Sequence, residues 1–196
     1  MEEFLRSTDV VDWQEPGVLA KARELSAGAR APLEAARRCF EWVRDHIQHS
    51  SDFQRNPVTC AASKVLAEGT GYCYAKSHLL AALLRANGIP AGFCYQRLSL
   101  DESGPPYTLH GLNAVHLPDF GWYRIDPRGN KPGVDAQFTP PVEKLAFPIV
   151  FREERLFPEI LADPLPVVVN ALRAHKTWDE MYRHLPDWEA DSLPDA

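Results

Sequence analysis

The feature that most constrains the fold is a change in hydrophobic periodicity at Pro90. Before it, apolar residues recur at helical spacing; after it, they form short aromatic and aliphatic runs between turn-forming sequences. The expected helices cover residues 16–27, 32–49, 59–67 and 71–87, and the expected strands are AGFCYQRLSL, HGLNAVHL and GWYRIDP. This order predicts an α+β fold in which N-terminal helices pack on an antiparallel sheet.

The rest of the chain has weaker patterns. Prolines are frequent from Pro132 to Pro166, which predicts a long segment that covers the sheet. A last helix is expected from Val167 to about His184, followed by a frayed tail, LPDWEADSLPDA. A chain of 196 residues, 45% of them hydrophobic, suits one domain, residues 1–196. We expect a catalytic core over about residues 30–130, with the covering segment and helix over 131–196.

Composition excludes several function classes. The formal net charge is −6 and Lys and Arg form no run, which argues against nucleic-acid binding. No stretch approaches the roughly 20 apolar residues of a membrane span, and MEEFLRSTDV is not a secretory signal, so we expect no membrane partner and a cytoplasmic location. Four cysteines without a CxxC pair indicate free thiols, with no disulfide framework and no zinc site.

Cys73 lies between a glycine-rich turn and a leucine-rich helix pattern, in EGTGYCYAKSHLLAALLRANGIPAG. A free cysteine in a helix is usually a buried packing residue. This one is expected in the first helical turn, where unpaired N–H groups and the helix dipole stabilise a thiolate. Such positions lower a cysteine pKa from about 8.5 to between about 3.5 and 7.5. Cys73 is therefore a candidate nucleophile.

His110 and Asp126 are the candidate base and orienting carboxylate, because the turn PDFG brings their strands together. A four-residue loop, Pro118–Gly121, would place the two side chains on opposite faces of the sheet. A loop of three or five residues, or one bulge, would place them on one face within diagonal reach. The hypothesis requires the second register.

The sequence GTGYCYAKSHLLAALLRANGIPA, followed by HGLNAVHLPDFGWYRIDP, resembles the core of the transglutaminase-like superfamily, within the papain-like cysteine fold. The resemblance covers about residues 59–128 and rests on a G-x-C at a helix start, a strand opening with His, and a G-W-x-x-x-D-P strand. It implies Cys73 as nucleophile, His110 as base and Asp126 as orienting carboxylate. No calcium loop of the D-x-D-x-D-G type is present, and we expect no cofactor.

The mechanism that the resemblance implies is acyl transfer. The Cys73 thiolate attacks the carbonyl of a peptide or a small amide or ester, a thioester forms, and His110 protonates the leaving group. The Cys73 backbone N–H is one expected oxyanion donor, and Gln54 and Asn56 are candidates for the second.

Other interpretations stay open. An acyltransferase similar to the arylamine N-acetyltransferases is one, although the little strand pattern after Arg128 favours hydrolysis. A non-catalytic binding module with a vestigial triad is another. A metal site from Cys73, His78, His110 and His116 matches no common ligand spacing. Arg128, in a turn-like sequence, is either solvated or a contact for an acidic substrate group.

Overall fold

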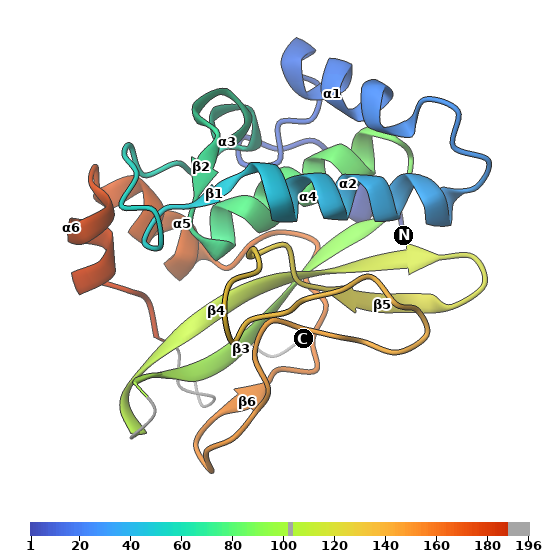
Figure 1. The fold of residues 1–196 in the computed structure, drawn as a ribbon. Helices are drawn as coiled ribbons and strands as arrows, with labels where there is room; N and C mark the ends of the chain where they lie inside the picture. The colour runs from blue at the N-terminus through green and yellow to red at the C-terminus, as the bar shows by residue number, and fades with distance from the viewer. Residues whose placement is uncertain (102–103, 188–196) are drawn as a thin grey trace.

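The computed structural model describes residues 1–101 and 104–187, which form a helical layer packed on a sheet (Figure 1). The helical layer contains η1 (Glu2–Leu5), α1 (Pro16–Ser26), α2 (Pro32–His46), α3 (Ala62–Glu68) and α4 (Cys73–Ala86), with the short strands β1 (Gln48–His49) and β2 (Thr70–Gly71) pairing in parallel beside them. The predicted α+β class is confirmed.

The sheet has the strand order β5-β4-β3-β6 and is antiparallel throughout. Its strands are β3 (Ala91–Asp101), β4 (Gly104–Leu117), β5 (Gly121–Ile125) and β6 (Arg155–Leu156). Two helices, α5 (Pro166–Ala174) and α6 (Trp178–Arg183), return the chain to the end of the molecule where α4 begins (Figure 1).

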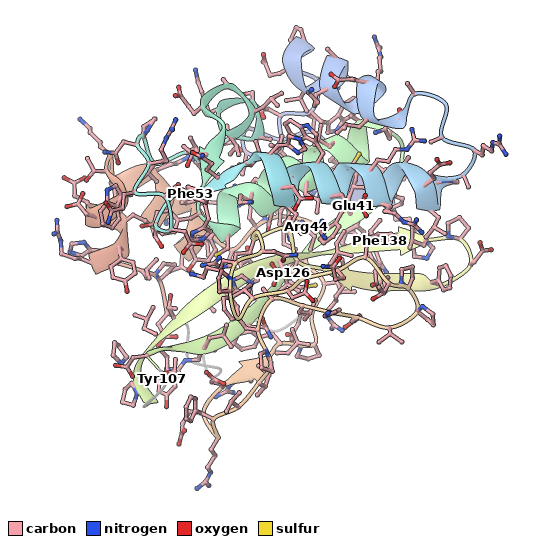
Figure 2. The ribbon with its side chains drawn as sticks, in the orientation of Figure 1. Glu41, Arg44, Phe53, Tyr107, Asp126 and Phe138 are labelled. Atoms are coloured by element: carbon pink, nitrogen blue, oxygen red, sulfur yellow. The ribbon has the colours of Figure 1, made fainter. Side chains whose placement is uncertain are left out.

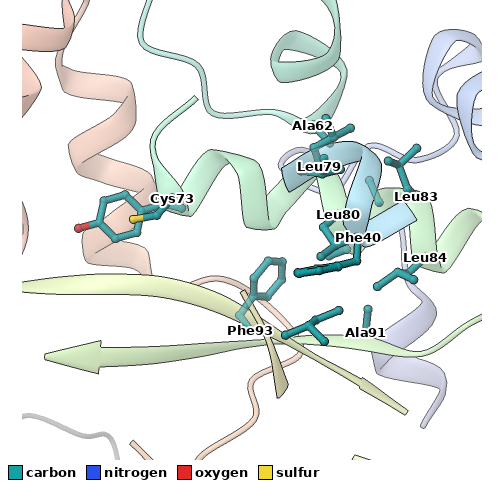
Figure 3. Close-up of a cluster of buried hydrophobic side chains, with 14 of the residues drawn as sticks. Phe40, Ala62, Cys73, Leu79, Leu80, Leu83, Leu84, Ala91 and Phe93 are labelled. Carbon is teal, nitrogen blue, oxygen red and sulfur yellow. The ribbon is translucent and has the colours of Figure 1, made fainter. Parts of the chain in front are cut away.

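Helix α4 is central to the core, since residues 73–85 are all buried. A helix that is buried all round must be covered on every side. Helices α1, α2 and α3 cover one side of α4, and β3 and β4 cover the other. Figure 3 shows leucines of α4 in one cluster with Phe40 and Phe93, with Cys73 at the far end of the helix from Leu84. Each fully buried leucine contributes about 1.5–3 kcal/mol, so α4 is firmly positioned.

The hairpin of β4 and β5 has a three-residue loop, Pro118–Phe120, because Leu117 pairs with Gly121 and Asn113 with Ile125. One step further, Leu112 is opposite Asp126, and His110 is the diagonal neighbour on the same face. The register that the catalytic hypothesis required is therefore present.

The segment after β5 packs on the sheet face that the helices leave free. A second hydrophobic cluster joins Cys94, Leu112 and Ala114 on the sheet to Leu145 and Ile160 on this segment. The residues beside Asp126 are thus closed off from solvent on both sides of the sheet.

Several predicted boundaries are wrong. The helix expected over 32–49 ends at His46 because 48–49 form β1, and the helix expected from residue 71 begins at Cys73 because 70–71 form β2. His110 does not open its strand, since β4 begins at Gly104. The helix expected over 59–67 begins at Ala62.

The C-terminal region also differs from expectation. The helix predicted over 167–184 is two helices, α5 and α6, separated where Thr177 forms a capping box with Glu180. Residues 185–187 are not frayed: the Leu109 N–H donates to the Pro186 carbonyl at 2.8 Å, and Arg97 binds both oxygens of Asp187. The remainder of the predicted tail, 188–196, lies outside the described residues.

Candidate active site

Cys73 is the first residue of α4 and is separated from β2 by Tyr72 alone. The chain reaches this position through Gly71, where a Cβ would lie 3.0 Å from the Ala75 Cβ and 3.2 Å from the Thr59 hydroxyl, so a side chain there would displace the helix start. As the first helical residue, Cys73 has a backbone N–H without an intrahelical acceptor. Its side chain is 7% exposed and lines a pocket of about 360 Å³.

His110 and Asp126 are in direct contact. The Nε2 atom of His110 lies 2.8 Å from Oδ2 of Asp126, which is fully buried near the middle of the molecule (Figure 2). The same carboxylate accepts hydrogen bonds from the backbone N–H groups of Ala146 at 3.0 Å and Arg128 at 3.1 Å. With Nε2 held in this way, Nδ1 is the ring nitrogen left for another partner.

The pKa shifts describe a charged pair. Burial alone would lower the pKa of His110, but the Asp126 carboxylate and the Cys73 side chain together raise it to about 10. Burial would raise the pKa of Asp126, but His110 and the two backbone donors hold it below its usual value. His110 lines the same pocket as Cys73, whose side chain contributes to the raised pKa of His110. The structure thus brings the three predicted residues together.

Two aromatic residues that the sequence did not identify pack against His110 and against the residues on either side of it. The Phe147 ring packs edge-on against the imidazole with 5.1 Å between centroids, and Gln96 holds the Phe147 carbonyl at 3.0 Å. On the neighbouring strand position, the Tyr74 ring packs on Gly111 and its hydroxyl donates to the Leu109 carbonyl. Phe147 belongs to the covering segment, whose pattern gave no sign of a contact with His110.

Arg128 is neither solvated nor free for a substrate group. It is 7% exposed and makes two hydrogen bonds to the Asp52 carboxylate, at 2.6 and 3.0 Å, and Lys131 binds the same carboxylate at 2.7 Å. Burial would raise the pKa of Asp52, but these two cations lower it. Asp52 and Arg128 therefore form a fixed ion pair on the pocket wall, beside His49, which also lines the pocket.

Neither candidate for the second oxyanion donor reaches the pocket. Gln54 is exposed, with a φ of 51°, and Asn56 uses its side-chain oxygen to accept the Trp178 N–H at 2.7 Å. Neither residue is among those that line the pocket with Cys73. Both lie in the loop after β1, where residues have no periodic orientation, so the sequence could not indicate which side chains turn inward.

The other cysteines and histidines have structural surroundings. The thiols of Cys39, Cys60 and Cys94 are free, and burial raises the pKa of Cys39 to about 12 and that of Cys94 to about 11. His78 is buried with Nδ1 2.8 Å from the Cys60 carbonyl. Within residues 1–101 and 104–187, no group of three or more His, Cys, Asp or Glu residues is arranged to hold a metal ion.

The C-terminal helix α6 and the residues after it form one wall of the pocket, through Tyr182 and Leu185. The Tyr72 hydroxyl donates to the Trp178 carbonyl at 2.5 Å and so ties this wall to the residue before Cys73. A larger pocket of about 460 Å³ lies at the other end of α4, around Gly88 and His116. It contains none of the three candidate catalytic residues, so volume alone does not identify the site.

No helix in the described part of the chain combines the length and the apolar character that crossing a bilayer requires.

Comparisons with known proteins agree with this fold. Residues 20–127, more than half of the chain, match the profile of the family described as the transglutaminase-like superfamily. A solved structure from Cytophaga hutchinsonii, named a "putative cysteine protease", is 18% identical, with a TM-score of 0.51 over 64% of this chain and 40% of that chain. The periplasmic domain of TgpA from Pseudomonas aeruginosa is 24% identical, with a TM-score of 0.46 over 57% of this chain and 42% of that chain.

The chain therefore corresponds to less than half the length of either solved structure. No curated protein matches the sequence.

Proposed function

Because the chain belongs to the transglutaminase-like superfamily, we propose that it is a cysteine hydrolase, a protease or amidase, with Cys73, His110 and Asp126 as its catalytic triad. The observation that carries the proposal is the buried contact of 2.8 Å between His110 and Asp126, in the pocket that the helix-start cysteine also lines. A base held by a carboxylate beside a thiol at a helix N-terminus is the arrangement that nucleophilic catalysis requires.

In the proposed reaction, the Cys73 thiolate attacks the carbonyl carbon of a peptide or a small amide or ester. The His110 imidazolium, stabilised by Asp126, transfers its proton to the leaving group as a thioester forms. Neutral His110 then takes a proton from water, which attacks the thioester and releases the acid and the thiolate. The Cys73 N–H stabilises the oxyanion in both steps, since it has no acceptor within the helix.

Hydrolysis is favoured over acetyl transfer because the described residues after Asp126 contain one two-residue strand, β6, and two short helices. An acyltransferase of the arylamine N-acetyltransferase type would have a barrel there. The cytoplasmic location and the absence of nucleic-acid and membrane partners remain proposals from composition.

The experiment that tests the function is labelling with a broad cysteine-directed electrophile, followed by mapping of the modified residue. We expect a single fast adduct on Cys73 in the wild-type chain and none in Cys73→Ser. A panel of p-nitroanilides and p-nitrophenyl esters, run beside acetyl-CoA with an arylamine, then assigns the reaction. Acetyl transfer without hydrolysis would replace the hydrolase by the transferase, and a Cys73 without reactivity would leave a non-catalytic binding module.

A further inference from the structure

A second histidine–aspartate pair lines the pocket that contains Cys73. His49, the last residue of β1, has a side chain 8% exposed, with Nδ1 3.8 Å from Oδ2 of Asp52. Its ring packs edge-on against Tyr72, the residue before Cys73, with 5.6 Å between centroids. The parallel pairing of His49 with Gly71 fixes this neighbourhood through the backbone. The proposed triad makes no use of the pair.

The Nδ1 atom of His49 is buried and has no hydrogen-bond partner. A buried polar atom without a partner costs about 1–3 kcal/mol, so its retention calls for a reason. The Asp52 carboxylate, with Oδ2 3.8 Å from Nδ1, favours the tautomer with the proton on Nδ1. The lone pair is then on Nε2, which makes His49 a hydrogen-bond acceptor through that atom.

The charges around His49 keep it neutral. Burial lowers its pKa well below the usual value, Arg128, Lys76 and His110 lower it further, and Asp52 opposes them. At the same pocket the pKa of His110 is raised to about 10. Two histidines whose environments push their pKa values apart are suited to different tasks, one as the proton donor and the other as a neutral acceptor.

We propose that neutral His49 accepts, through Nε2, a hydrogen bond from the water molecule that hydrolyses the thioester on Cys73. This inference rests on the proposed function. One hydrogen of the water passes to neutral His110 as the water oxygen bonds to the acyl carbon. The carbon–sulfur bond breaks, its electron pair returns to Cys73 as thiolate, and the carboxylic acid leaves. The other hydrogen of the water stays hydrogen-bonded to His49, and Asp52 acts as a positioning residue that fixes the tautomer.

The test separates acylation from deacylation with p-nitrophenyl acetate. His49→Phe keeps an aromatic ring against Tyr72 and removes both nitrogens, whereas His49→Gln retains an acceptor. For His49→Phe we expect p-nitrophenolate release in the first turnover within about twofold of wild type. We expect deacylation to be at least about tenfold slower, so that acetylated Cys73 accumulates in intact mass spectra. His49→Gln should recover part of the deacylation rate.

His78→Phe is the matched control, because His78 is also buried, also has one unpartnered nitrogen and also packs edge-on against an aromatic ring at 5.6 Å. It should leave both rates near wild type. Deacylation in His49→Phe as fast as in wild type, or equal slowing of both steps, would overturn the inference. If His49→Phe does not fold, His49→Met removes the same nitrogens with a flexible side chain. A wild-type chain without a first-turnover release would instead defeat the proposed function.

Discussion

Replacing Asp126 by Asn tests the role of the buried carboxylate, and its effect follows from three hydrogen bonds. Oδ2 accepts from His110 and Ala146, and Oδ1 accepts from the Arg128 N–H. An amide has one accepting oxygen, and turning it towards His110 and Ala146 preserves two of the three contacts. The Arg128 N–H then faces the amide NH2. We expect this unsatisfied donor to cost about 1–3 kcal/mol.

That loss is smaller than the roughly 5–15 kcal/mol stability of an ordinary domain, so the variant should fold. Its chemistry should suffer more. Without the carboxylate charge, the pKa of His110 falls from about 10 towards 6.5, and the imidazolium that protonates the leaving group is no longer stabilised. We expect turnover to fall by about two to four orders of magnitude, as in other triads. The alkaline limb of the kcat/KM profile should move from near pH 10 towards neutrality.

The assay is hydrolysis of an acyl p-nitroanilide over a range of pH, with thermal melting followed by circular dichroism. Asp119→Asn is the control, since Asp119 is an exposed residue in the loop of the same hairpin. Full activity of Asp126→Asn, or an alkaline limb that does not move, would refute the reasoning. Loss of the fold would make Asp126 a structural residue that ties the sheet to its covering segment.

Two further predictions concern packing and pH. In Gly111→Ala the new Cβ would lie 2.9 Å from Cδ1 and 3.2 Å from Cα of Tyr74, so β4 must shift. We expect a free energy of unfolding lower by about 1–3 kcal/mol and at least about tenfold lower turnover. Gly17→Ala is the control, because its Cβ would lie 3.9 Å from the nearest neighbour, and it should keep wild-type activity; equal melting temperatures and rates in the two variants would contradict the prediction. Burial lowers the pKa of His78 from 6.5 to about 4, so the folded state binds the proton less readily than the unfolded state. The free energy of unfolding should therefore fall as the pH drops from about 6.5 to about 4, with roughly 3 kcal/mol of the loss due to His78. If urea unfolding of His78→Phe shows the same pH dependence as wild type, this prediction is wrong.

The sequence predicted the elements that carry the proposed chemistry, because those elements have strong local patterns. The leucine-rich run fixed α4 and placed Cys73 at its start. The hairpin register was left between alternatives, since PDFG is read as a four-residue loop. In the structure Gly121 adopts a φ of 69° and pairs with Leu117, which leaves three residues in the loop. A three-residue hairpin loop often ends at a glycine in the left-handed region, so the sequence could have predicted the three-residue loop from Gly121.

The break between α5 and α6 could also have been predicted from the sequence, because Thr177 and Glu180 have the spacing of a capping box. The residues that form the pocket wall could not have been predicted. Asp52 and Phe147 come from segments without periodicity, and His49 was predicted at the end of a helix although it lies in β1. The orientation of all three depends on contacts with distant parts of the chain. The same reason explains why Gln54 and Asn56 were chosen as candidates and yet lie away from the pocket that Cys73 lines.

The most direct test of a thiolate–imidazolium pair is the rate of iodoacetamide alkylation of each cysteine as a function of pH. At about pH 6, Cys73 alone should react quickly, because the helix start and the His110 imidazolium stabilise its thiolate. Burial raises the pKa of Cys39, Cys60 and Cys94. The buried thiols of Cys39 and Cys94 should therefore react only on unfolding, and the half-buried Cys60 should react much more slowly than Cys73. In His110→Ala the reactivity of Cys73 should move to higher pH, since the ion pair is lost. Labelling of Cys73 no faster than an ordinary thiol, or an unchanged pH profile in His110→Ala, would contradict the catalytic account.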